Sequence, residues 1–223
     1  SMSEFAMRAK LREKVEEISN EYRLLGALRG HPNVVNCEDQ MIIPHENDMG
    51  WDIYIRMELL QSLPDYVREN GMTVDSVIKL GSDMCSALEL CRENNIIHRD
   101  IKPQNIFVSR YGVFKLGDFG VAKASTIRTS ADKVGTYSYM APEVYKGKGY
   151  DDRVDIYSLG MVLYWLLNDR RGPFLPMPPQ VPTPEQITDA QIRRFRGETL
   201  PQPKNGSAAL KKVVMTACSY KIA

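Results

Sequence analysis

Apolar residues in the first part of the chain recur at two different spacings. Between positions 3 and 28 they recur every three or four residues, which predicts one long amphipathic helix. Over 51–58 they alternate with polar residues, and shorter apolar runs lie at 34–37 and 40–43, so three strands are predicted there. The pattern that follows is mainly helical, with helices predicted over 64–69, 73–94, 153–168, 184–196 and 207–219 and short strands at 96–97, 106–108 and 113–116. This order predicts an α+β fold in which a small strand-bearing part precedes a larger helical part.

Polar and proline-rich segments separate these elements. A polar turn is predicted over 44–50, and a long polar loop rich in Ser, Thr and Lys over 118–134. Six prolines between residues 172 and 184 predict an ordered connecting loop. The longest nearly apolar stretch, 156–167, is shorter than the roughly 20 residues of a membrane span, so no membrane segment is predicted within the chain.

The composition narrows the class of protein. The chain has 223 residues, of which 43% are hydrophobic and 26% charged, as in ordinary globular domains. Its 29 basic and 28 acidic residues give a formal net charge of +1, and this near balance argues against a general nucleic-acid or anionic-membrane binder. The four cysteines lack metal-ligand spacing, which predicts reduced thiols in a cytoplasmic protein.

Three short motifs carry the candidate chemistry: HRDIKPQN at 98–105, DFG at 118–120 and APE at 141–143. Moving a phosphoryl group needs a divalent metal to neutralise phosphate charge, and Mg²⁺ prefers hard oxygen ligands. Asn105 and Asp118 supply such oxygens, each beside a predicted strand end. The motifs in this order and spacing therefore indicate phosphoryl transfer.

The acceptor side of the same reaction needs two further groups. A carboxylate must orient the acceptor hydroxyl and take its proton, and Asp100 lies five residues before Asn105. A cation beside the acceptor helps to hold the transferring phosphoryl group, and Lys102 lies two residues after Asp100. All four side chains thus come from two of the motifs.

With these motifs the sequence closely resembles the eukaryotic-like (Hanks-type) serine/threonine protein kinases. The residues around the motifs are similar to those of bacterial members. The resemblance covers nearly the whole chain and implies one bilobal catalytic domain. A partial N-lobe over residues 1–60 would contain the αC helix, short antiparallel strands and the hinge, and residues 61–223 would form a mostly helical C-lobe. The family also implies ATP and Mg²⁺ (or Mn²⁺) as cofactors, protein substrates with Ser or Thr acceptors, no nucleic-acid partner and a cytoplasmic location.

The resemblance assigns roles around the reacting groups. Asp100 would be the catalytic base, and Asn105 and Asp118 would hold Mg²⁺. Lys102 and Thr136, the latter in GTYSYMAPE, would contact the acceptor side and favour Ser or Thr over Tyr.

The resemblance also assigns a nucleotide site. Glu21 matches the αC glutamate that pairs with the lysine of the family's third strand. Met57 matches the gatekeeper, and Glu58 to Leu60 match the hinge whose backbone binds adenine. Phe107 would lie under the adenine ring.

Further residues match the family's internal framework. Leu25, Cys37, His98 and Phe119 match the stack of side chains that links the lobes in the active state. Asp155, in DIYSLG, would brace the catalytic loop, and a carboxylate in so apolar a helix needs hydrogen-bond partners on physical grounds alone.

Arg99 precedes the predicted base and implies control by phosphorylation. In the family such an arginine awaits a phosphate from the activation segment, and a phosphate adds about −1.5 to −2 of charge. The candidate phosphorylation sites are Ser125, Thr126, Thr129 and Ser130.

The printed sequence departs from the family pattern at both ends. It contains neither the Gly-rich loop GxGxxG nor the third-strand lysine, nor the arginine that pairs with the APE glutamate. The 223-residue chain alone is therefore expected to be inactive and to self-associate through its N-terminal helix region. Two alternatives to an active protein kinase are a pseudokinase that serves as a scaffold and a small-molecule kinase of the same fold. A Gly-rich loop and lysine encoded upstream would favour the active enzyme over the pseudokinase.

Overall fold

The computed structural model describes residues 26–45, 50–119, 137–147 and 149–220, together with residues 7, 9, 10, 12, 13, 15, 16 and 19. The described residues between 7 and 19 are helical, as the periodicity predicts. At the end of the predicted helix, Gly26–Leu28 forms a 3₁₀ turn, η1, and not an α-helical turn.

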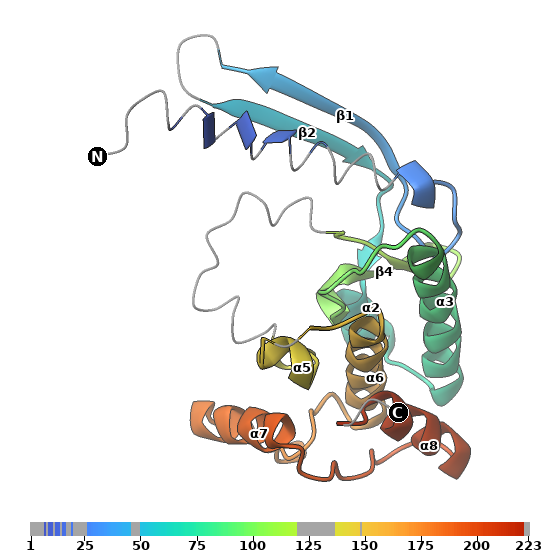
Figure 1. Cartoon of the computed structure of the whole chain (residues 1–223). Helices are drawn as coiled ribbons and strands as arrows, with labels where there is room; N and C mark the ends of the chain where they lie inside the picture. Colours follow the sequence, from blue (N-terminus) through green and yellow to red (C-terminus); the bar gives the residue numbers. More distant parts are fainter. Residues whose placement is uncertain are drawn as a thin grey trace.

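Two long strands form an antiparallel hairpin that extends away from the helices (Figure 1). They are β1 (Cys37–Pro44) and β2 (Trp51–Met57), and Met41 lies opposite Tyr54 in the register. The prediction of two strands at 34–37 and 40–43 was wrong, since one strand with an irregularity between Cys37 and Asp39 covers most of this region. Burial in β2 alternates as predicted up to its last residue, Met57, which is 53% exposed.

A second, three-stranded sheet lies among the helices. Its order is β3 (Gln61–Ser62), β4 (Ile106–Val108), β5 (Phe114–Leu116), and both pairings are antiparallel. The strand predicted at 96–97 is not formed, and β3 was not predicted.

The two sheets are joined by backbone hydrogen bonds at residues 33–35. Val34 forms a parallel bridge with Leu116, Val35 N–H donates to the Leu116 carbonyl at 2.9 Å, and Leu116 N–H donates to the Asn33 carbonyl at 2.8 Å. The first predicted strand is therefore mainly a connection from the hairpin to β5.

Four of the helices begin at a residue whose side-chain oxygen caps the helix N-terminus. Ser62, Thr73, Thr183 and Ser207 each accept a hydrogen bond from a backbone N–H in the first turn of the helix that follows. The helices are α2 (Leu63–Asn70), α3 (Val74–Glu93), α5 (Pro142–Tyr145), α6 (Arg153–Leu167), α7 (Pro184–Arg196) and α8 (Ala208–Ala217), with a 3₁₀ turn η2 (Pro103–Asn105). Five of these six helices were predicted; the short α5 was not.

The core of the helical part centres on α6, which packs against both α3 and α8 (Figure 1). The buried stripe of α3 consists of the six residues that its periodicity predicts: Val77, Leu80, Met84, Ala87, Leu88 and Cys91. Gly160 allows α6 and α8 to approach, because a Cβ there would lie 2.8 Å from the Ala217 Cβ. The segment 172–183 connects α6 to α7 without helix or strand, as the prolines predict.

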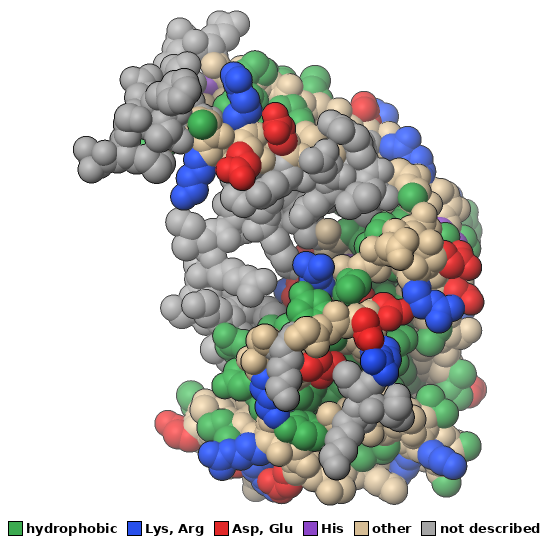
Figure 2. Space-filling model, in the orientation of Figure 1, with side chains coloured by type: hydrophobic (Ala, Val, Ile, Leu, Met, Phe, Trp, Pro, Cys, Tyr) green, Lys and Arg blue, Asp and Glu red, His purple; other side chains and the backbone are tan. Residues whose placement is uncertain are grey.

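Positive and negative side chains are interspersed on the face shown in Figure 2, in keeping with the near-neutral charge. Within the described part of the chain, no helix has both the length and the apolarity required to cross a bilayer.

Candidate active site

The loop that contains the HRD motif is fixed by a carboxylate from the core. Asp155, on α6, is 2% exposed, and its two oxygens accept hydrogen bonds from the backbone N–H groups of His98 (2.7 Å) and Arg99 (2.8 Å). Arg99 has a φ of +66°, a backbone conformation that few side chains adopt without support. Burial raises the pKa of the Asp155 carboxyl, and the His98 charge and the two N–H donors oppose this rise. The predicted bracing contact is thus present as two direct hydrogen bonds.

Asp100, Lys102 and Asn105 form one connected group. The Asn105 amide nitrogen donates to the Asp100 backbone carbonyl and to its carboxylate, each at 2.8 Å. Lys102 Nζ lies 2.9 Å from the same carboxylate oxygen, Oδ2. The Asp100 side chain is only 8% exposed, so its buried charge depends on these hydrogen-bonding partners.

Asn105 and Asp118 suit a hard divalent cation. Gly117 N–H donates to the Asn105 carbonyl at 2.9 Å, which brings Asp118 beside the loop, and Asp118 has a φ of +57°. The Asn105 amide nitrogen is used by Asp100, so its Oδ1 is directed elsewhere. A carboxylate plus an amide oxygen is a donor set that Mg²⁺ accepts when phosphates and water supply the remaining ligands. The chemistry of this pair therefore fits the expected metal.

The His98 side chain connects the HRD motif to the DFG motif. Its Nε2 lies 2.9 Å from the Gly117 carbonyl, and its ring meets the Phe119 ring edge-on with centroids 4.7 Å apart. Of the four residues expected to stack between the lobes, the structure thus brings these two together. Cys37 lies at the start of β1, opposite Met57.

The predicted hinge is held by the side chain of Glu58. Its Oε1 accepts from the Asn36 backbone N–H and from Lys115 Nζ, both at 2.7 Å, and its own N–H donates to the Asn36 carbonyl at 3.2 Å. Leu59 is fully exposed and Leu60 is half-buried. This arrangement joins the end of β2 to β5.

Phe107 lies where the hinge meets the second sheet. It is half-buried in β4 and lies opposite Ser62, two residues beyond Leu60, and opposite Lys115 on β5. The hinge and the predicted floor of the adenine site are therefore neighbours.

Some sequence-predicted residues lie outside the described residues. They are Glu21, Leu25, Ser125, Thr126, Thr129, Ser130 and Thr136.

Comparison with known proteins settles the family. The sequence matches the family described as "Protein kinase domain" over residues 4–222. The chain belongs to this protein kinase family. The family match therefore agrees with the resemblance that the HRD, DFG and APE motifs indicated.

Several proteins similar to this kinase domain are named as serine/threonine-protein kinases. It is 41% identical over 140 residues to a "probable serine/threonine-protein kinase" of Clostridium perfringens, covering 60% of this chain and 20% of that protein. It is 41% identical over 149 residues to serine/threonine-protein kinase PknB of Mycobacterium tuberculosis, covering 63% and 24%. A serine/threonine-protein kinase 36 of Pongo abelii is 36% identical over 161 residues, covering 70% and 12%. The chain thus spans a quarter or less of the length of each of these relatives.

Sequence reasoning missed three residues of this kinase domain that contact its motifs or its hinge. Asn36 and Lys115 bind Glu58, and Arg194 on α7 donates hydrogen bonds to Tyr157, on α6, and to the segment before α5. Local spacing carries no signal for them, because the partners are 22 to 57 residues apart.

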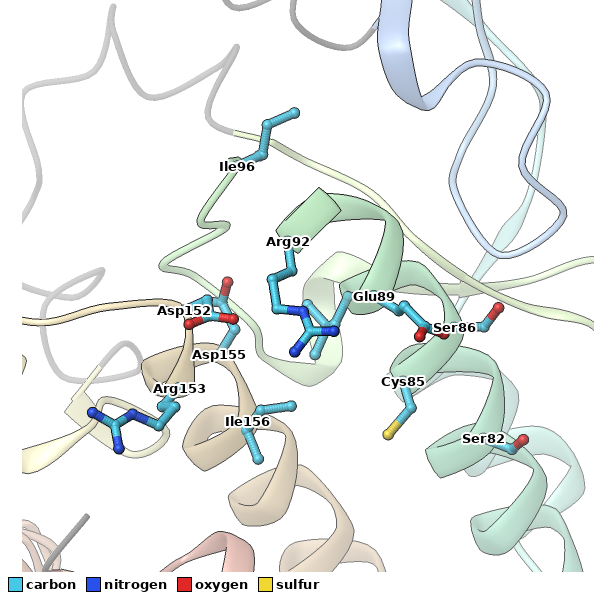
Figure 3. Close-up of a pocket in the computed structure, with 11 residues that line it drawn as sticks. Ser82, Cys85, Ser86, Glu89, Arg92, Ile96, Asp152, Arg153, Asp155 and Ile156 are labelled. Carbon is cyan, nitrogen blue, oxygen red and sulfur yellow. The ribbon is translucent and has the colours of Figure 1, made fainter. Parts of the chain in front are cut away.

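A cavity of about 580 Å³ lies between α3 and α6 of the kinase domain (Figure 3). Cys85 and Arg92 from α3 face Ile156 from α6 across it, whereas Arg153 points away. Asp155 is the one residue with an expected site role among its described lining residues. Burial, and secondarily the Glu89 charge, raises the pKa of the Cys85 thiol, which keeps it in the less reactive protonated form at neutral pH.

Any residue larger than glycine at position 117 is expected to destabilise the protein. A Cβ at this position would lie 2.7 Å from Val35 Cγ2 and 2.9 Å from Phe107 Cε2, so one of these side chains must move. Gly117→Ala should therefore lower the free energy of unfolding by about 1–3 kcal/mol. The melting temperature should fall by roughly 2–4 °C for each kcal/mol.

Two variants control this prediction. Gly149→Ala, where a Cβ would meet nothing within 4 Å, should leave the melting temperature unchanged. Adding Val35→Ala to Gly117→Ala should recover part of the loss. A Gly117→Ala protein as stable as the wild type would show that the backbone relaxes without cost.

Proposed function

We propose that this chain is part of the catalytic domain of a serine/threonine protein kinase, with residues 1–60 in its N-lobe and 61–223 in its C-lobe. The protein would transfer the γ-phosphoryl group of ATP to Ser and Thr hydroxyls of protein substrates. The observation that supports this most directly is the connected group of Asp100, Lys102 and Asn105, which joins a carboxylate, a cation and an amide in one place.

The proposed mechanism assigns one task to each of these residues. The Asp100 carboxylate orients the acceptor hydroxyl and takes its proton as the bond from that oxygen to the γ-phosphorus forms. The bond between the γ-phosphorus and the β–γ bridging oxygen breaks, and ADP leaves. Lys102 supplies positive charge beside the transferring group, and its contact with Asp100 fixes the carboxylate. Asn105 and Asp118 would hold Mg²⁺ (or Mn²⁺), which neutralises phosphate charge when bound.

The proposed nucleotide site lies against the hinge. The backbone of Glu58 to Leu60 would bind adenine, with Phe107 beneath the ring and Met57 at its inner edge. Glu21 would pair with a lysine of the small lobe. The link from Glu58 to Lys115 supports this placement, because it holds the hinge against the sheet that carries Phe107.

We further propose control by phosphorylation of Ser125, Thr126, Thr129 or Ser130. Thr136 would contact Asp100 and Lys102 on the acceptor side. The held conformation of Arg99 supports this, since its backbone is fixed by Asp155 and its guanidinium lies 5.6 Å from the centre of the Tyr150 ring. A phosphate would offer this cation a stronger partner than a ring face.

We also propose a bacterial origin and a cytoplasmic location for the protein, and self-association of the 223-residue chain. The free cysteines support a reducing compartment. Exposed apolar residues on the hairpin support self-association near the N-terminal helix, and light scattering would measure it. They are Met41, Ile43, Tyr54 and Met57.

The function is tested by incubating the complete natural protein with Mg²⁺, radiolabelled ATP and a general protein acceptor. We expect label on Ser and Thr of the acceptor, and mass spectrometry should find phosphate among Ser125, Thr126, Thr129 and Ser130. Absence of any transfer would favour a pseudokinase scaffold. Transfer to small molecules but not to protein would favour a small-molecule kinase.

A further inference from the structure

Arg194 is a buried cation whose hydrogen-bond acceptors are neutral. It is 3% exposed, although it lies on α7, whose other residues are mostly polar. Its guanidinium donates to the backbone carbonyls of Met140 (2.6 Å) and Tyr137, and to the Tyr157 hydroxyl (3.0 Å). A guanidinium is costly to bury, so its burial here is expected to have a role in holding the groups to which it donates.

The two carbonyls belong to the ends of one short segment, 137–140, which leads into α5. A single planar guanidinium that binds both ends fixes the distance between them. The aromatic neighbours of Arg194 support the same segment. Tyr145, on α5, stacks on Phe195 with ring centroids 3.9 Å apart and meets the Tyr137 ring edge-on at 5.9 Å. Two consecutive residues of α7 thus hold the segment and the helix that follows it.

We propose that Arg194 is a positioning residue for the acceptor peptide. This inference rests on the proposed kinase function, in which Thr136 contacts Asp100 and Lys102. Segment 137–140 continues the chain directly from Thr136, so with that proposed contact it would border the place where an acceptor hydroxyl reaches Asp100. Arg194 holds this segment as a wall that sets the position of the peptide, and it contacts neither ATP nor the reacting atoms.

Removal of the guanidinium should weaken peptide binding and leave the nucleotide unaffected. In the complete natural protein, Arg194→Met should raise the KM for a peptide acceptor by roughly tenfold or more, because segment 137–140 loses the two hydrogen bonds that hold its ends. The KM for ATP, and the slow transfer of phosphoryl to water, should stay within about twofold of the wild type. Arg194→Lys keeps the charge but not the planar pair of donors, so its peptide KM should lie between those of the wild type and Arg194→Met.

Arg196→Met is the matched control, because Arg196 is an exposed arginine on the same helix. It should leave both KM values unchanged. If Arg194→Met does not fold, Arg194→Lys alone decides between the outcomes.

The inference would be overturned by equal effects on peptide and ATP kinetics, which indicate a general structural role, or by unchanged peptide KM. Failure of the proposed function itself appears differently, as a wild-type protein that transfers no phosphoryl group to the peptide.

Discussion

Asp100→Asn is expected to lower kcat by at least about 100-fold while the KM for ATP changes little. The substitution keeps the size of the side chain but removes the group that accepts the proton. Asn105 can still donate to the oxygen of an asparagine at position 100, so the loop should retain its shape. The effect should therefore appear in the chemical step and not in nucleotide binding.

The measurement is a steady-state assay with peptide and ATP varied in turn. Asp75→Asn, which makes the same change at an exposed position in the first turn of α3, should leave kcat unchanged. An Asp100→Asn protein that keeps more than about a tenth of wild-type kcat would remove Asp100 from the role of base.

Asp155→Ala is expected to have the largest effect on stability. It leaves the N–H groups of His98 and Arg99 without their acceptor in a buried site, and each unsatisfied group costs about 1–3 kcal/mol. The free energy of unfolding should therefore fall by about 2–5 kcal/mol. The left-handed conformation of Arg99 loses its support as well, so activity should be lost even at temperatures where the protein stays folded.

Chemical denaturation and the kinase assay check this together. Asp155→Asn keeps one acceptor oxygen and should fall between the wild type and Asp155→Ala. Asp152→Ala, at the start of the same helix, removes a carboxylate that makes no capping bond and should cost little. A loss of less than about 1 kcal/mol in Asp155→Ala would mean that solvent replaces the missing acceptor.

The helices longer than α5 were predictable because each one carries its own signal. The buried stripe of α3 and the capping residues of α2, α3, α7 and α8 can be read from neighbouring positions alone. The short strands were not, since two or three residues contain too few positions to show a period, and their formation depends on partners far along the chain. Val34 illustrates this: its apolar run suggests a strand, yet a single bridge to Leu116 decides its structure.

In the candidate site too, contacts between residues close in sequence were predictable and those between distant residues were not. The HRD and DFG motifs were visible because their residues lie close in sequence. The brace from Asp155 was implied by the family resemblance, and a carboxylate in an apolar helix indicated only that it must have hydrogen-bond partners. The contacts of Glu58 with Lys115 and of Arg194 with segment 137–140 were not predictable. Both cross 54 or more residues, and neither partner breaks a local pattern.

The link between the two sheets has a mechanical consequence. The hairpin leaves the helical part through residues 33–36 and Glu58, which lie together at its base. Beyond that base, the eight residues of β1 form an arm of about 26 Å at roughly 3.3 Å per residue. A rotation of only about 5° at the base would carry the tip of this arm through about 2 Å, the scale of a hydrogen bond made or broken. The ion pair of Glu58 and Lys115, whose side chains are only 25% and 14% exposed, lies at this base and ties the end of β2 to β5, so it opposes such a rotation.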